Sequence, residues 1–549
     1  MSVKLKKSWR LYLGWGLLGL WLLFICWPYF IKLPVQNEST FLYEGYLVSL
    51  GKLPYRDFFD FILPGIFYLV AGLIKLFGVS MVAFRLTALT MILGCIAITL
   101  YLARFFLPRK GWLTLGLLLL VFHLPRVLEI QHHLCSAFTG MLAVLCMWHA
   151  LFQQDHIRPK LLLLAGFWIG LTTLFTQTLG VTLGIALGLY LLFFLTLLQK
   201  QSLGRSLTYT ILHLTLPALL PIALTFGYFA TQGTLGKLWY STFTFLARGS
   251  YAATTTHIYF LDGWMKLNTY RKIILSNGPI ALLAFFLLLS GSLPLIGLVW
   301  LPTYLLRKRN HPKPALWNTT SLLHWRLLFL WVAGIGFFAA MFSYPNTRMV
   351  LWHSWLLYLM AWIAFHMACH TRPQLERLLG GLVTLCVLTF LILSTEKSFK
   401  LLQLPRMVSY GTREHGLILE DTPQNIRGMN ALFRTIHDQS PPGENLFVYN
   451  GAPHYYLLTS QLNPTRFQML MAVYNTPEQI QETLHDLTHK KPTFIIYDHL
   501  DQLDFEQDQR FKKWQHYDYH LHGIETLLTE KYTLLSQCNN LWLFKRKDH

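Results

Sequence analysis

The chain has 549 residues, of which 54% are hydrophobic, 15% aromatic and only 13% charged. This apolar share exceeds that of a soluble domain of similar length, so the composition excludes an ordinary soluble protein and predicts an integral membrane protein. The net charge of +20 is better explained by membrane topology and anionic lipid than by nucleic acid, because no basic helix with base-stacking aromatic residues lies outside the apolar runs.

Apolar runs follow one another from the N-terminus to about residue 395. About 20 apolar residues cross the hydrocarbon of a bilayer, and on this basis we predict about eleven spans, at roughly 11–31, 81–103, 111–124, 134–152, 160–176, 178–198, 207–231, 278–306, 323–343, 349–369 and 375–395. The first run lacks a small-residue cleavage site and is interpreted as a signal anchor. The shorter stretch 64–78 contains Lys75 and is predicted to lie on the outer surface without crossing.

Basic residues orient these spans. They occur in the N-terminal tail and in every second loop: Lys4, Lys6, Lys7, Arg10; Arg104, Arg109, Lys110; Arg158, Lys160; Lys200, Arg205; Arg307, Lys308, Arg309, Lys313; Arg372, Arg377. The positive-inside rule makes these segments cytoplasmic. Eleven spans with a cytoplasmic N-terminus then place the C-terminus outside.

The first outer segment, residues 33–80, concentrates charge in a chain that has little of it. Within 24 positions it carries Asn37, Glu38, Glu44, Arg56, Asp57 and Asp60. Carboxylates beside a lipid surface indicate a reaction or binding site. The predicted topology places other polar residues on the same side: Glu129, His132, His133, Thr176, Gln177, Tyr251, Arg348 and His353. We therefore expect a pocket that opens toward the outer leaflet.

The composition changes after residue 395, which predicts a membrane region over 1–395 and a soluble α/β domain over 396–549. Helical periodicity is present in NIRGMNALFRTIHDQ and in TPEQIQETLHDLTHK, the latter opened by a Thr cap and a Pro. LFVYN, TFIIYD, YTLLSQ and LWLFKR are typical of short buried strands. The region has no nucleotide-binding or hydrolase motif, and the chain has no CxxC pair, so we expect no dedicated zinc or iron–sulfur site.

The first outer segment and the run after it carry an ordered set of short motifs: Asn37-Glu38, Tyr43 and Gly45, Gly51, Pro54-Tyr55, Asp57-Phe58, Pro64-Gly65, Phe77-Gly78 and Arg85-Leu86. This order resembles the GT-C glycosyltransferases that use polyprenyl-phosphate sugars, a family that includes protein O-mannosyltransferases and aminoarabinose transferases. HHLCSAF, LAGFWIGLTTLFTQTLG and PPGENLFVYNGAPHYYLL extend the similarity over most of the chain. The chain departs from the family pattern at Asn37, where the family commonly has Asp, and at Thr176, where many relatives have a basic residue.

The resemblance implies a polytopic α-helical membrane enzyme with a C-terminal extracytoplasmic α/β domain, in the cell inner (plasma) membrane. Its expected activity is inverting transfer of a hexose or pentose from a polyprenyl-phosphate donor to a lipid, glycan or protein acceptor at the outer face. Glu38 is the expected general base, and Asp57 is a second carboxylate that could orient the acceptor or hold a divalent cation. The expected substrate-binding residues are Asn37, Arg56, Arg85, His132, His133, Gln177, Tyr251 and Arg348, with Arg85 and Arg348 as candidates for the phosphate.

Other interpretations stay open. Asp57 could be the base in place of Glu38, Arg85 could extend to the membrane interface without binding phosphate, and the His132-His133 pair could cap a helix. A transporter or lipid-handling protein would carry charges deep in its spans or an internal repeat. A catalytically silent relative is the third alternative, because Asn37 cannot act as a base.

Overall fold

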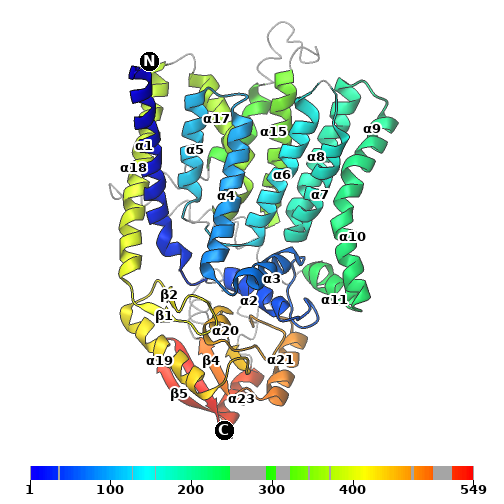
Figure 1. Ribbon diagram of the computed structural model, residues 1–549. Coiled ribbons are helices and arrows are strands. Elements are labelled where there is room, and N and C mark those ends of the chain that lie inside the picture. The colour runs from blue at the N-terminus through cyan, green and yellow to red at the C-terminus, as the bar shows by residue number, and fades with distance from the viewer. Residues whose placement is uncertain are drawn as a thin grey trace.

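The computed structural model describes residues 2–34, 37–125, 128–154, 156–247, 292–304, 322–343, 347–369, 373–449, 451–470, 475–498 and 522–547. Figure 1 shows an array of roughly parallel long helices, with the N-terminus at its far end. A thin layer of shorter helices covers the opposite end of the array, and a region of strands and helices that carries the C-terminus lies beyond this layer. The two termini therefore lie at opposite ends of the protein.

Most helices of the array coincide with predicted apolar runs. They are α1 (Ser2–Phe30), α4 (Met81–Ala103), α5 (Arg109–His123), α6 (His132–Phe152), α7 (Pro159–Phe175), α8 (Gln177–Phe193) with η1 (Phe194–Leu198), α9 (Leu203–Thr210) with η2 (Ile211–Thr215) and α10 (Leu216–Thr231), α15 (Leu322–Ala339) with η4 (Ala340–Ser343), α16 (Thr347–His353), α17 (Trp355–Cys369) and α18 (Pro373–Gln403). A further apolar helix covers Ser292–Tyr304.

Within the described part of the chain, five helices are long and apolar enough to cross a membrane: Met81–Ala103, His132–Phe152, Gln177–Leu198, Leu203–Thr231 and Leu322–Ala339. The chain is thus a multi-pass membrane protein. The predicted run 349–369 differs from the expectation, because Ser354 separates α16 from α17. The count of eleven spans stays a prediction, and much of the run 278–306 lies outside the described residues.

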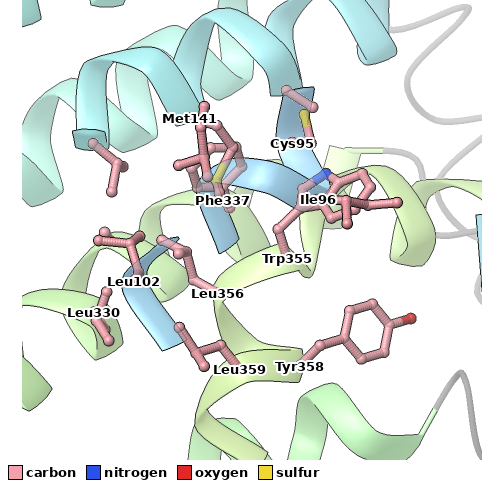
Figure 2. Packing of buried hydrophobic residues seen from close by; sticks show 14 of the residues in the cluster. Cys95, Ile96, Leu102, Met141, Leu330, Phe337, Trp355, Leu356, Tyr358 and Leu359 are labelled. Atoms are coloured by element: carbon pink, nitrogen blue, oxygen red, sulfur yellow. The ribbon is translucent and has the colours of Figure 1, made fainter. Parts of the chain in front are cut away.

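Close packing holds the array together. Figure 2 shows side chains from α4, α6, α15 and α17, including Cys95, Met141, Phe337 and Trp355, meeting in one buried cluster. Helices α7 and α10 approach each other so closely that a Cβ added at Gly170 would lie 2.2 Å from the carbonyl oxygen of Ala218. Only glycine permits this contact, so substitution there would push the two helices apart.

The first outer segment is more helical than a loop. It contains α2 (Asn37–Ser49) and α3 (Gly65–Phe77), which lie across the end of the array together with α11 (Leu235–Trp239), η3 (Tyr240–Thr244) and α12 (Phe245–Ala247). Tyr43 and Tyr55 of this segment are both 0% exposed, whereas Tyr68, Phe77, Trp239 and Phe243 of the layer are exposed. The layer therefore connects the array to the C-terminal region.

The C-terminal region contains two sheets. β1 (Arg406–Val408) pairs antiparallel with β2 (Gly416–Ile418). The larger sheet has the order β3 (Leu446–Tyr449), β4 (Phe494–Asp498), β6 (Leu541–Arg546), β5 (Tyr532–Cys538), with only the β3–β4 pair parallel. Around it lie α19 (Pro423–Gln439), α20 (His454–Thr459), α21 (Pro477–Lys490) and α23 (His522–Lys531). All four predicted strands are present. The two predicted helices are also confirmed, and Thr476 and Gln479 form a capping box at α21.

Specific polar contacts join this region to the array. The carboxylate of Glu414 accepts hydrogen bonds from the Ser80 hydroxyl (2.6 Å) and from the main-chain N–H of Met81 (2.9 Å), so it caps the N-terminus of α4. The Tyr43 hydroxyl of α2 accepts a bond from the N–H of Asn463 (2.8 Å), and its ring stacks on Tyr456. The position of α4 and α2 therefore depends on the C-terminal region.

Candidate functional site

The centre of the site is a buried ion pair between Glu38, in the first turn of α2, and Arg85, in the second turn of α4. Their side chains are 2% and 4% exposed. Glu38 also accepts the main-chain N–H of Ile130 (3.0 Å). Arg85 donates through Nε to the Tyr29 carbonyl (3.1 Å) and through Nη1 to both Glu38 and the Leu128 carbonyl (2.7 Å). The pair thus fastens α1, α2, α4 and the segment before α6 to one another.

Two opposed effects set the ionisation of Glu38. Burial raises the pKa of this carboxyl to about 7, and the neighbouring Arg85 offsets part of that rise. Glu129, a half-buried carboxylate on the segment before α6, adds to the rise through like-charge repulsion. A carboxylate with a pKa near neutrality can accept a proton at physiological pH, as a general base must. The sequence placed Glu129 on the same side of the membrane as Glu38 without a role, and its effect on Glu38 appears only in the folded structure.

Histidines of α6 and α16 form a cluster that begins two positions after Ile130, the residue whose N–H binds Glu38. The Nδ1 of His132 lies 3.0 Å from the Thr176 hydroxyl, and its ring packs edge-on to Phe41 of α2. His133 is in contact with His132, with ring centroids 3.8 Å apart, and lies 5.3 Å from the ring of His353. The contact between His132 and Thr176 joins α6 to the turn between α7 and α8.

Several buried polar atoms in this histidine cluster have no hydrogen-bond partner: Nδ1 of His133, Nε1 of Trp352, Nε2 of His353, Oγ of Ser354 and Nε1 of Trp355. Buried polar groups are nearly always paired in native proteins, so a concentration of unpaired ones in one place needs an explanation. Most of these atoms are donors or can donate, and aromatic rings surround them. All of them are fully buried, so the hydroxyls of a sugar could pair with them only after the surrounding side chains move.

Arg56 and Asp57 contact each other further along the first outer segment. Nε and Nη2 of Arg56 donate to the two carboxylate oxygens of Asp57 (2.9 and 2.8 Å), and Asp57 also accepts the N–H of Leu53 (2.7 Å). The hydrogen bonds from Arg56 lower the pKa of Asp57. Asp57 is therefore a weaker base than Glu38 and already uses both oxygens.

Glu44 and Asp60 form a second carboxyl pair, also in the first outer segment. Both are buried, and a side-chain hydrogen bond joins Glu44 to Asp60. Burial and the nearby Asp60 raise the pKa of Glu44 well above its usual value, and burial raises that of Asp60 to about 6. Burial therefore favours the neutral form of Glu44. This pair was not assigned a role from the sequence.

The remaining predicted residues are placed as follows. Gln177 begins α8 and donates to the Phe61 carbonyl (3.3 Å), so it joins α8 to the first outer segment. Asn37 begins α2 and Arg348 lies in α16, five positions before His353, and the structure describes only their main chains. Tyr251 lies outside the described residues. The structure thus brings Glu38, Arg85, His132 and His133 together.

A divalent cation at Asp57 was a sequence-based expectation. Within the described residues, no three His, Cys, Asp or Glu side chains converge in the manner of a metal site. Both Asp57 oxygens accept hydrogen bonds from Arg56, a donor set that does not favour cation binding. The residues present do not fit a cation at Asp57.

The helical array, the layer of α2 and α3 with its buried carboxylates, and the C-terminal sheet region together define a multi-pass membrane protein of the GT-C fold. The chain aligns with the crystal structure of ArnT from Cupriavidus metallidurans bound to undecaprenyl phosphate over 98% of both chains, with a TM-score of 0.52 and 12% identity. The apo structure of ArnT from the same organism aligns over 97% of this chain and 98% of that chain, with a TM-score of 0.43 and 12% identity. No protein-family model and no curated protein matches the sequence. The resemblance in fold that was stated from the sequence is therefore confirmed.

Proposed function

We propose that this protein is a membrane glycosyltransferase that moves a sugar from a polyprenyl-phosphate donor to an acceptor hydroxyl. The observation that carries the proposal is the buried pair of Glu38 and Arg85, in which burial raises the pKa of the Glu38 carboxyl to about 7. The histidine cluster is connected to this pair through Ile130, whose N–H binds Glu38 two positions before His132. The shared fold with a protein whose structure contains undecaprenyl phosphate supports the class of donor.

We also propose that the chain crosses the cell inner (plasma) membrane eleven times, with residues 396–549 as an extracytoplasmic domain. The positive-inside pattern of the loops supports this orientation. The placement of the N- and C-termini at opposite ends of the protein agrees with an odd number of spans. In this orientation Glu38 and the histidine cluster face the outer leaflet. The boundary at residue 395 falls inside α18, which continues to Gln403.

In the proposed reaction, Glu38 takes the proton of the acceptor hydroxyl. The acceptor oxygen bonds to the anomeric carbon while the bond from that carbon to the phosphate oxygen breaks, and the polyprenyl phosphate leaves with the electron pair. A single displacement of this kind inverts the anomeric centre. Because phosphate is a good leaving group, one base and positive charge near the phosphate form a sufficient set.

Arg85 holds Glu38 ionised in this scheme. Its guanidinium already contacts Glu38 and the carbonyls of Tyr29 and Leu128, so we assign the contact with the departing phosphate to Arg348 ahead of Arg85. His132, His133, Gln177, Tyr251 and Asn37 are assigned to binding of the substrates.

The experiment compares Glu38→Gln with Asp57→Asn in membranes supplied with a polyprenyl-phosphate sugar. Glu38→Gln keeps the size of the side chain but removes its basicity, so transfer should fall by roughly 10² to 10⁴. Mass spectrometry of surface glycans and glycoproteins, with and without the protein, identifies the sugar and the acceptor. Unchanged surface glycosylation together with no transfer by the intact protein would refute the proposed function.

A further inference from the structure

A second pocket lies away from the Glu38 site, where the first outer segment, α11 and η3, and α21 of the C-terminal region meet. Its volume is about 410 Å³, and it is lined by Arg56, Gly236, Lys237, Tyr240, Ser241, Arg466 and Glu482. Figure 1 shows α11 and α21 facing each other at this junction. The volume lies within the range of small-molecule sites.

Two arginines in the pocket are held in the same way. Arg56 is bound by Asp57 through Nε and Nη2, and Arg466 is bound by Glu482 through Nε (2.5 Å) and Nη2 (2.9 Å). These bonds use one edge of each guanidinium, and among the described residues its Nη1 makes no hydrogen bond. A carboxylate that grips Nε and Nη2 fixes the plane of the guanidinium, so Nη1 is presented in a defined direction.

Lys237 adds a third cation. It is exposed and forms no ion pair with the described residues. The two arginines are balanced by Asp57 and Glu482, so the pocket retains one excess positive charge. An anion that enters it therefore meets three donor groups and a net attraction.

A main-chain hydrogen bond joins the first outer segment, which carries Arg56, to the segment that carries Arg466. The N–H of Phe59 donates to the Arg466 carbonyl (2.8 Å), and the Phe59 ring packs on Phe467. The guanidinium of Arg466 lies 4.9 Å from the ring centroid of Phe467. These contacts limit the movement of Arg466 relative to Arg56, and such preorganisation lowers the entropy cost of binding.

We propose that this pocket binds an oxyanion group, a phosphate or a carboxylate, carried by one of the two substrates of the transfer. Only the identity of these substrates rests on the proposed function, because an anion can bind in the pocket without any sugar transfer. Asp57 then acts as a positioning residue for Arg56, and the C-terminal region contributes directly to substrate recognition through Arg466.

The test is calorimetric titration of the full chain in detergent micelles with inorganic pyrophosphate. Lys237→Gln and Arg466→Gln should each weaken binding about 10-fold or more, the effect expected for loss of one charge-assisted contact. Lys237 is exposed, so its variant should fold even if Arg466→Gln does not. Lys75→Gln, which removes an exposed charge of α3 outside the pocket, is the matched control and should bind as the parent does.

Absence of saturable binding in the parent chain would overturn the proposal. An equal affinity of Lys237→Gln and the parent chain for pyrophosphate would also overturn it. A loss of affinity in Lys75→Gln as large as that in Lys237→Gln would do the same, because it would indicate only general charge attraction. Transfer kinetics then identify the source of the anion, because Lys237→Gln should raise KM for the acceptor or for the polyprenyl-phosphate sugar, according to which one carries it. Pyrophosphate binding that depends on Lys237 in a chain without transfer activity would refute the proposed function and leave the pocket supported.

Discussion

Replacing Arg85 by Met tests whether the ion pair with Glu38 organises the site. The change removes the partner of a carboxylate that is 2% exposed, and breaking a buried pair in this way costs about 3–5 kcal/mol of folding stability. Protonation of Glu38 in the variant would reduce this loss, because a neutral carboxyl needs no charged partner. The loss should therefore be largest at pH 8 and smaller at pH 5.5, where a neutral carboxyl leaves mainly the lost main-chain bonds of Arg85, roughly 1.5–3 kcal/mol.

The double variant Glu38→Gln/Arg85→Met separates stability from chemistry. It has no buried unpaired charge, so its stability should recover relative to Arg85→Met at pH 8 and should vary less with pH, while transfer stays low because no base remains. Thermal unfolding in detergent micelles, with amide hydrogen exchange over residues 37–49, measures both effects. Arg104→Met is the matched control, because Arg104 is exposed and lies over the Tyr101 ring. A loss in Arg85→Met that is the same at both pH values, and is not recovered in the double variant, would refute the reasoning.

Further outcomes concern pH, Asp57 and the topology. Transfer should rise with pH through an apparent pKa near 7, because burial raises the pKa of Glu38 to about that value and the base acts when it is ionised. The free energy of unfolding should fall as the pH rises from the ordinary pKa of a glutamate toward 7, because Glu38 loses its proton in the unfolded chain at a lower pH than in the folded chain. A flat profile would remove Glu38 from the chemistry. Asp57→Asn should lower transfer less than Glu38→Gln, and the reverse order in kinetics would make Asp57 the base. Accessibility tags should report Gln201 as cytoplasmic and the C-terminus as external, and a cytoplasmic C-terminus would contradict the predicted orientation.

The elements that could be predicted are those with a local signal. Apolar runs located α4, α6 and the helices from Gln177 to Thr231, because the bilayer sets the length of such a run. The sequence Thr-Pro at 476–477 predicted the start of α21, since the cap and the first-turn Pro act within one turn. The alternation of β4 and α21 predicted a mixed α/β region.

Contacts between distant residues could not be predicted. Glu38 and Arg85 were both candidates, but nothing in the sequence shows that they neutralise each other across 47 positions. The break at Ser354 is invisible in an apolar run, because Trp352 and Trp355 on either side of it resemble any span residue. The pairing of Arg466 with Glu482 likewise depends on how α21 packs, which is a property of the folded chain.

The cap that Glu414 places on α4 has a consequence for the order in which the protein is made. Ser80 and Glu414 are 334 positions apart, and at about 5–20 residues per second roughly 17–67 seconds separate their synthesis. During that time the first N–H groups of α4 lack the carboxylate that later binds them, although the helix itself can already be in the membrane. Arg85 lies one turn beyond these groups. The final setting of the ion pair with Glu38 is therefore a late event in biogenesis, completed when the C-terminal region folds against the finished helical array.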